Sequence, residues 1–181
     1  MIALEISGMV EVRVGSGIYV LNTSSPDLKL RNNTIDIGPS PLELIEARKE
    51  IEGANAALAA QRIGTDCLEQ LEQAVEKMVH DNMTGADGDR EFHLLIAKAT
   101  GNSVLETLTA YLWDQQQHSP MWTKLIELMQ EKKLHTIVLD DHKCLLDSLR
   151  QKNSEEAQAI MRTHLNNARD IYFDLIGEEE N

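Results

Sequence analysis

The spacing of apolar positions predicts helices over most of the chain. From residue 40 onward, apolar side chains return every three or four positions, as on the buried face of an amphipathic helix. Ser40, Pro41 and Glu43 have the types and spacing of a capping box with proline at the first helical position, so they mark a helix start. Breaks at glycine, proline and capping residues predict about seven helices, over residues 41–62, 65–80, 87–100, 103–117, 121–134, 138–152 and 154–176.

Residues 1–21 follow a different pattern. Segments 10–14 and 17–21 are rich in β-branched and aromatic residues on either side of a Gly-Ser turn, so they predict a β-hairpin. Residues 22–39 are polar and contain two prolines, which is typical of a linker. We therefore expect a hairpin at 1–21, a linker at 22–39 and an all-α antiparallel helical bundle at 40–177.

Composition and charge agree with a helical protein and restrict its partners. Aromatic residues make up only 4% of the chain, and glycine and proline number 10 and 4. The net charge of -13 opposes broad attraction to nucleic acid or anionic membranes, so a DNA contact needs a local basic element. No apolar run approaches the roughly 18 residues that span a bilayer, and no signal-like N-terminus is present. We expect a cytoplasmic protein without a membrane partner.

Three histidines, His93, His142 and His164, have apolar residues at the positions that share their helical face. Asp89 lies one turn before His93, and Asp-x-x-x-His is a spacing of metal ligands. Burying a carboxylate and three imidazoles is costly, and a divalent cation offsets that cost by pairing with their lone pairs. The alternative is a set of core histidines satisfied by hydrogen bonds, with Asp89 favoured by its place in a first helical turn. The spacing leaves both hypotheses open.

Arg48 also lies on an apolar stripe, with Leu44, Ile45 and Ile51 around it. A buried guanidinium needs an anion. That anion is either the carboxylate of a ligand or an internal partner such as Glu52, one turn further along.

These residues together resemble the FadR subfamily of GntR transcription regulators, whose effector-binding domain, called FCD, is an all-α bundle of six or seven helices. Residues 4–13 and 15–20 are similar to the end of the family's winged helix-turn-helix and its wing. Residues 46–52 are similar to the opening FCD helix with its pocket arginine. The segments 89–93, 141–143 and 164–165 match the family's metal motif. The resemblance implies a divalent metal ion (zinc, nickel or manganese) held by Asp89, His93, His142 and His164.

Within the subfamily, the chain is most similar to regulators of hexuronate catabolism. The wing, segment 38–44, Trp113 and segment 119–122 carry this similarity. It implies a sugar acid or other small carboxylate as effector, with Arg48, Gln116 and Trp122 as effector-binding residues. Those hexuronate regulators have an arginine where this chain has Gln116.

The resemblance also implies a homodimer that binds operator DNA. In the family the recognition helix lies in the N-terminal part of the DNA-binding module, which here would precede Met1, so we expect a truncated module. Operator DNA would then be bound only through the missing part, and Arg13 is the one DNA contact expected in the wing. Val14 stands where such wings often carry a second basic residue.

The leading hypothesis is therefore the effector-sensing domain of a GntR repressor of sugar-acid catabolism, which is not an enzyme. A metal-dependent enzyme acting on a small carboxylate is the main alternative, because three histidines and an aspartate can hold a catalytic ion with an open position. Against it, the sequence has no separate general-base motif and no Glu-x-x-His pair. A third hypothesis is a structural protein in which the metal acts as a staple.

Overall fold

The computed structural model describes residues 10–13, 17–20, 39–80, 86–117, 122–123 and 135–179. Contacts divide the chain into two units, Met1–Ile37 and Gly38–Asn181.

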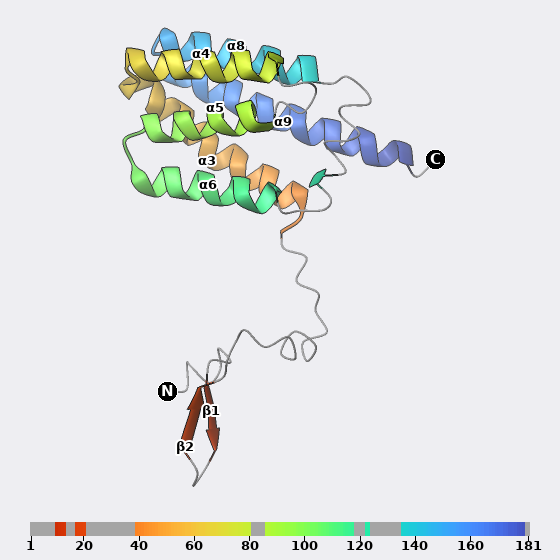
Figure 1. Cartoon of the computed structure of the whole chain (residues 1–181). Coiled ribbons are helices and arrows are strands. Elements are labelled where there is room, and N and C mark those ends of the chain that lie inside the picture. Colours follow the sequence, from red (N-terminus) through yellow and green to blue (C-terminus); the bar gives the residue numbers. More distant parts are fainter. Residues whose placement is uncertain are drawn as a thin grey trace. The chain divides into compact units, whose positions relative to one another are not determined.

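The first unit contains a β-hairpin. Strands β1 (Val10–Arg13) and β2 (Gly17–Val20) pair antiparallel, with Val10 opposite Val20 and Arg13 opposite Gly17 (Figure 1). That this hairpin is the wing of a DNA-binding module stays a prediction, and so does the DNA contact of Arg13. The linker predicted at 22–39 lies outside the described residues, apart from Pro39.

The described part of the second unit contains six helices, and the all-α prediction is confirmed. They are α3 (Pro41–Arg62), α4 (Thr65–His80), α5 (Ala86–Ala99), α6 (Ser103–Gln117), α8 (His135–Arg150) and α9 (Ser154–Glu179). The predicted bounds of the first four agree to within one residue, whereas α8 begins and ends earlier than predicted and α9 runs further. The helix predicted at 121–134 lies outside the described residues, except that Trp122 and Thr123 are helical.

Helix α3 begins at the predicted capping box. The Ser40 side chain accepts a hydrogen bond from the Glu43 backbone N–H at 3.3 Å, and Glu43 accepts one from the Ser40 backbone N–H at 2.8 Å. From this start, α3 contacts α5, α6, α8 and α9. The helices form a closed series of neighbours around the core, in the order α3, α9, α8, α4, α5, α6 and back to α3 (Figure 1).

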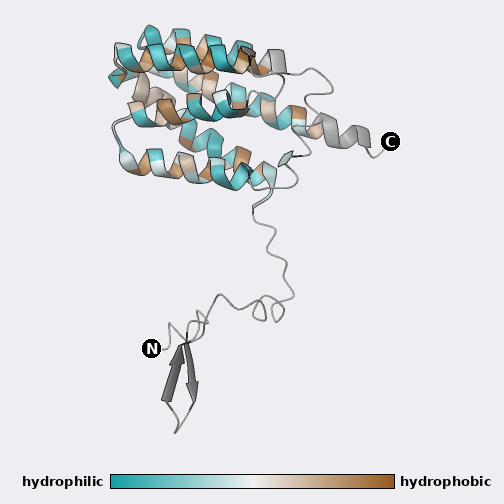
Figure 2. Cartoon of the chain, in the orientation of Figure 1, coloured by the Kyte–Doolittle hydropathy of each residue, from teal (hydrophilic) through white to brown (hydrophobic). Residues whose placement is uncertain are grey.

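The apolar core is formed by buried side chains of α3, α4, α5, α8 and α9. Apolar and polar segments alternate along the ribbons (Figure 2). On α8 the buried stripe includes His142, Leu145, Leu146 and Leu149. A histidine thus occupies a position at which the helical period requires a core residue. The largest fully buried apolar side chains are Phe92, Ile45, Leu71, Ile96, Leu145, Leu149, Met161 and Leu165.

Helices α4 and α5 approach each other closely at Gly88. A β-carbon at this position would lie 2.8 Å from the Ala74 carbonyl oxygen and 2.9 Å from the Met78 backbone nitrogen. Real β-carbons do not come this close to backbone atoms, so Gly88 is required for the approach. Because Asp89 is the next residue, the same contact determines where its carboxylate lies.

We predict that Gly88→Ala lowers the free energy of unfolding by about 1–3 kcal/mol, as overpacking does. Alanine is the better helix former by about 1 kcal/mol, but the clash with α4 outweighs this gain. Gly64→Ala is the matched control, because no atom lies within 4 Å of the added β-carbon, and it should change stability by less than about 0.5 kcal/mol. Urea denaturation measures both variants. Equal stability of the Gly88 variant and the wild type would contradict this packing.

Candidate metal centre

Four residues from three helices converge in the interior of the bundle. Asp89 and His93 lie one turn apart on α5, His142 comes from α8 and His164 from α9, and one ligand atom of each lies within 4.8 Å of the others. The three histidines are exposed by 5% or less. The structure therefore brings together all four residues that the sequence singles out.

The spacing of these atoms suits a single ion. Asp89 Oδ1 lies 2.9 Å from His142 Nε2 and 3.3 Å from His93 Nε2. The two Nε2 atoms lie 3.3 Å apart, and the His164 ring centroid is 4.5 Å from that of His142. Atoms bound to one ion at about 2.0–2.2 Å lie roughly 3–4 Å from each other. This is close to the separations observed.

Each imidazole has an acceptor beside its other nitrogen. His142 Nδ1 lies 2.7 Å from the Val138 carbonyl oxygen, and His93 Nδ1 makes an ion-pair contact with Glu52 Oε2. An acceptor at Nδ1 favours the tautomer with the proton there and leaves a lone pair on Nε2. Two Nε2 lone pairs and a carboxylate oxygen then face one another, an arrangement that is repulsive until a cation or a proton lies between them.

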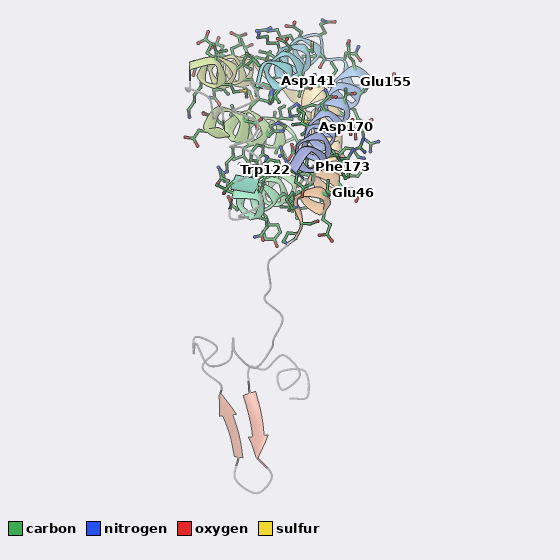
Figure 3. The ribbon with its side chains drawn as sticks, turned by 90° about the vertical axis from the view of Figure 1, so that its right-hand side faces the viewer. Glu46, Trp122, Asp141, Glu155, Asp170 and Phe173 are labelled. Atoms are coloured by element: carbon green, nitrogen blue, oxygen red, sulfur yellow. The ribbon has the colours of Figure 1, made fainter. Side chains whose placement is uncertain are left out.

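His164 also has an acceptor beside Nδ1, at a longer distance than that of His142. Its Nδ1 lies 3.5 Å from Asp141 Oδ2, which accepts a hydrogen bond from Asn167 Nδ2 at 2.8 Å. Figure 3 labels Asp141 on α8. Burial lowers the pKa of His164 to about 4, and the neighbouring His142 adds to the effect. His164 is therefore neutral near pH 7, and neutral imidazole is the form that binds metals.

Two carboxylates at the centre stay ionised, the partly exposed Asp89 and the fully buried Glu52 beside the cluster. Burial raises the pKa of Asp89, but the adjacent His142 and His93 outweigh it and hold the pKa well below its usual range. Burial likewise raises the pKa of Glu52, and the charges of Arg48 and His93 lower it to about 2.

Three atoms of the cluster lack a hydrogen bond of ordinary alignment within the described residues, namely Asp89 Oδ1, His93 Nδ1 and His164 Nδ1. Buried polar atoms are rarely left in this state without a reason. Of the three, Asp89 Oδ1 lies beside the Nε2 atoms of His93 and His142, so this oxygen and the imidazoles fit a divalent cation.

Arg48 lies beside this cluster and is 3% exposed. Its Nε donates to Glu52 Oε1 at 2.7 Å, and its Nη1 donates to Gln116 Oε1 at 2.7 Å. The guanidinium carbon lies 3.9 Å from the ring centroid of Trp113. Of the two partners expected from the sequence, the internal one, Glu52, is present.

Arg48 and Gln116 belong to a polar seam between two helices. The seam comprises Arg48, Glu52 and Asn55 of α3 with Thr109, Trp113 and Gln116 of α6, all buried. On each helix the three positions follow the i, i+4, i+7 spacing of one face. That spacing was visible in the sequence, yet Asn55 and Thr109 were not singled out. Trp122, the third expected effector residue, is partly buried against the apolar core.

An FCD domain model matches residues 43–167 of the chain. The chain belongs to the FCD-domain family of GntR transcription regulators. It is 31% identical to the Uxu operon regulator of Haemophilus influenzae, over 99% of this chain and 68% of that protein. It is 35% identical to the Uxu operon transcriptional regulator of Escherichia coli, over 96% of this chain and 74% of that protein. The solved structure of Streptococcus agalactiae GntR aligns with a TM-score of 0.59 at 27% identity, over 93% of this chain and 77% of that one.

Membership of this family decides between the hypotheses drawn from the sequence. The relatives are transcription regulators, so this FCD-domain protein is a regulator and not an enzyme. Within the described residues, no helix combines the length and apolarity needed to cross a membrane.

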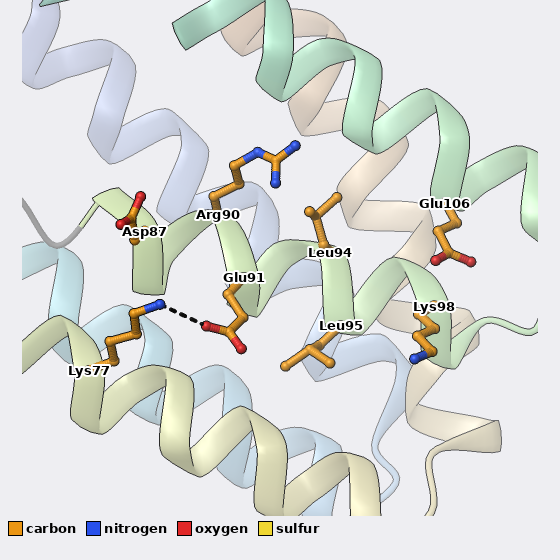
Figure 4. Close-up of a pocket in the computed structure, with 8 residues that line it drawn as sticks. All are labelled: Lys77, Asp87, Arg90, Glu91, Leu94, Leu95, Lys98 and Glu106. Carbon is orange, nitrogen blue, oxygen red and sulfur yellow. Dashed lines mark hydrogen bonds and ion pairs between the residues drawn. The ribbon is translucent and has the colours of Figure 1, made fainter.

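The regulator also has an open surface pocket of about 380 Å³ on the outward side of α5 (Figure 4). Acidic and basic side chains alternate around it, and two of its lining residues, Lys77 and Glu91, form an ion pair at 3.2 Å. Asp89 and His93 belong to the opposite, inward side of α5, so this pocket is separate from the candidate metal centre. Its lining residues are Lys77, Asp87, Arg90, Glu91, Leu94, Leu95, Lys98 and Glu106.

Proposed function

We propose that the helical unit is the metal-containing sensor of a small carboxylate effector, a sugar acid, and that the regulator represses genes of sugar-acid catabolism. The observation that carries this proposal is the convergence of Asp89, His93, His142 and His164 in the interior of the bundle. The resemblance to hexuronate regulators and the relationship to the Uxu operon regulators support the choice of effector.

The four ligands are three nitrogen donors and one oxygen donor, a set that suits zinc, nickel or manganese. When bound, such an ion supplies positive charge that attracts an effector carboxylate. Arg48 and Gln116 contribute hydrogen-bonding groups next to the centre. Trp122 is the third effector-binding residue of this proposal.

Two further buried atoms of the seam support a ligand with hydroxyl groups. Asn55 Oδ1, an acceptor, and Trp113 Nε1, a donor, have no hydrogen-bond partner within the described residues. A hydroxyl group both donates and accepts, so it satisfies atoms of either kind. A polyhydroxy acid therefore matches the chemistry of the seam better than a simple carboxylate does.

GntR regulators bind operator DNA as well as small-molecule effectors. We assign the DNA contact to the family's winged N-terminal module, to which the hairpin with Arg13 belongs in this proposal. The net charge of the whole chain, -13, opposes DNA binding outside a local basic element.

We also propose that a second copy of the chain packs on α6. Val104, Leu108 and Tyr111 follow the i, i+4, i+7 spacing and are 64%, 41% and 56% exposed. A row of large exposed apolar side chains on one helix face is typical of an interface.

We predict that the chain, purified without chelator, carries about one divalent cation, as elemental analysis will measure. His142→Ala should lose most of the metal and lower the melting temperature, because it removes a ligand and leaves the other donors unsatisfied in the core. Lys143, the next residue on α8, is exposed, so Lys143→Ala is the control and should keep the metal content and the melting temperature of the wild type. Metal-free wild type, or unchanged metal content in the His142 variant, would reject the site.

A hexuronate or aldonate should raise the melting temperature, whereas the corresponding neutral sugar should not. Ligand at 100 times its Kd stabilises the native state by about 2.7 kcal/mol. Arg48→Lys should reduce this shift because lysine lacks the planar fork that binds a carboxylate. Lys98→Ala, in the surface pocket, should leave it unchanged. If no hexuronate or aldonate raises the melting temperature more than the neutral sugars do, the effector assignment is wrong. If the Arg48 variant shows the same rise in melting temperature as wild type, the role of Arg48 is wrong.

Leu108→Lys should convert the dimer to a monomer, because it places a charge in the centre of the apolar row on α6. Phe173→Lys, at an exposed apolar position on α9, should leave the dimer intact. Light scattering after size-exclusion chromatography measures both masses. If the wild type is a monomer, or if the Leu108 variant remains a dimer, α6 is not the interface.

A further inference from the structure

Glu52 lies between the arginine of the seam and the candidate metal centre. It is 1% exposed and belongs to α3, whereas the four candidate ligands come from α5, α8 and α9. Its Oε1 accepts from Arg48 Nε at 2.7 Å, and its Oε2 accepts from Arg48 Nη2 at 3.3 Å. The same Oε2 contacts His93 Nδ1. One carboxylate thus touches both the guanidinium and an imidazole.

The contact with His93 is on the side of the ring that faces away from the centre. His93 Nε2, on the other side, lies 3.3 Å from both Asp89 Oδ1 and His142 Nε2. A carboxylate next to Nδ1 favours the tautomer with the proton on that nitrogen. The lone pair is then on Nε2, where the other donors converge.

The two other histidines have different partners at Nδ1. For His142 the partner is the neutral Val138 carbonyl. For His164 it is Asp141, whose Oδ2 lies 3.5 Å from Nδ1 and whose side chain is 21% exposed. Of these three Nδ1 partners, Glu52 is the fully buried carboxylate. Glu52 also accepts hydrogen bonds from Arg48.

We propose that Glu52 is a positioning residue of the metal centre. It holds the His93 proton on Nδ1, directs Nε2 towards the ion, and links that ligand to Arg48 of the polar seam. This inference rests on the proposed metal-containing function. Partners of this kind commonly change metal affinity 10–100-fold when they are removed.

Two double variants separate the effect of the acceptor at His93 Nδ1 from the effect of the buried charges of Arg48 and Glu52. Replacing Arg48 together with Glu52 avoids an unpaired buried charge, which would destabilise the fold. Arg48→Met/Glu52→Leu removes the acceptor at His93, whereas Arg48→Met/Glu52→Gln retains an amide oxygen that accepts the Nδ1–H. Both variants have the same net charge and similar volume, so they differ mainly in the acceptor.

The affinity of the full chain for Zn²⁺ is measured by titration against a competing chelator. We expect Arg48→Met/Glu52→Leu to bind Zn²⁺ 10–100-fold more weakly than wild type, and Arg48→Met/Glu52→Gln to recover most of the loss. Equal affinity of the two double variants, with Zn²⁺ bound by wild type, overturns the role of Glu52 alone. Failure of wild type to bind Zn²⁺, Ni²⁺ or Mn²⁺ overturns the metal function and this inference together.

A measurement on the wild type tests the same inference when a double variant does not fold. Nitrogen-15 spectra of the histidine rings in the Zn²⁺-loaded chain report which nitrogen carries the proton. We expect His93 to be protonated at Nδ1 and to bind through Nε2. Binding through Nδ1, or a proton on Nε2, overturns the assignment.

Discussion

The stability of the bundle interior depends on positive or hydrogen-bonding groups that offset the negative charge of carboxylates placed there. Glu52 is ionised and almost completely buried, and a carboxylate in that position is costly unless a positive group pairs with it. Arg48 provides this pairing from the same helix, and Asp89 faces two imidazoles. The Arg48–Glu52 pair lies within α3, whereas the contact of Glu52 with His93 joins α3 to α5 and that of Asp89 with His142 joins α5 to α8.

This arrangement places the candidate metal centre next to the polar seam. The candidate metal centre joins α5, α8 and α9, and the polar seam joins α3 and α6. Glu52 belongs to the seam and contacts a ligand of the centre. In a close-packed interior, a change at one group is felt by the groups that touch it. In the proposed function, an effector that altered the partners of Arg48 would therefore act on the neighbourhood of His93.

Local patterns were sufficient to predict the six described helices and to single out the four residues that converge in the bundle. The capping box at Ser40 marked the start of α3, and helical periodicity placed three histidines on buried faces. The metal role of those residues came from the family resemblance, since spacing alone left core histidines as an alternative. Helix ends were predicted less well for α8, which begins at His135 without a strong capping signal.

What the sequence by itself determined is which residues share a helix face; the tertiary structure decided which faces meet. The partner of Arg48 was open between a ligand and Glu52, and the packing of α3 against α6 added Gln116, 68 residues away. The contact of Glu52 with His93 and the close approach at Gly88 were not visible in the sequence either. Periodicity is a property of one helix, whereas these contacts depend on how separate helices pack, and that is determined by the whole core at once.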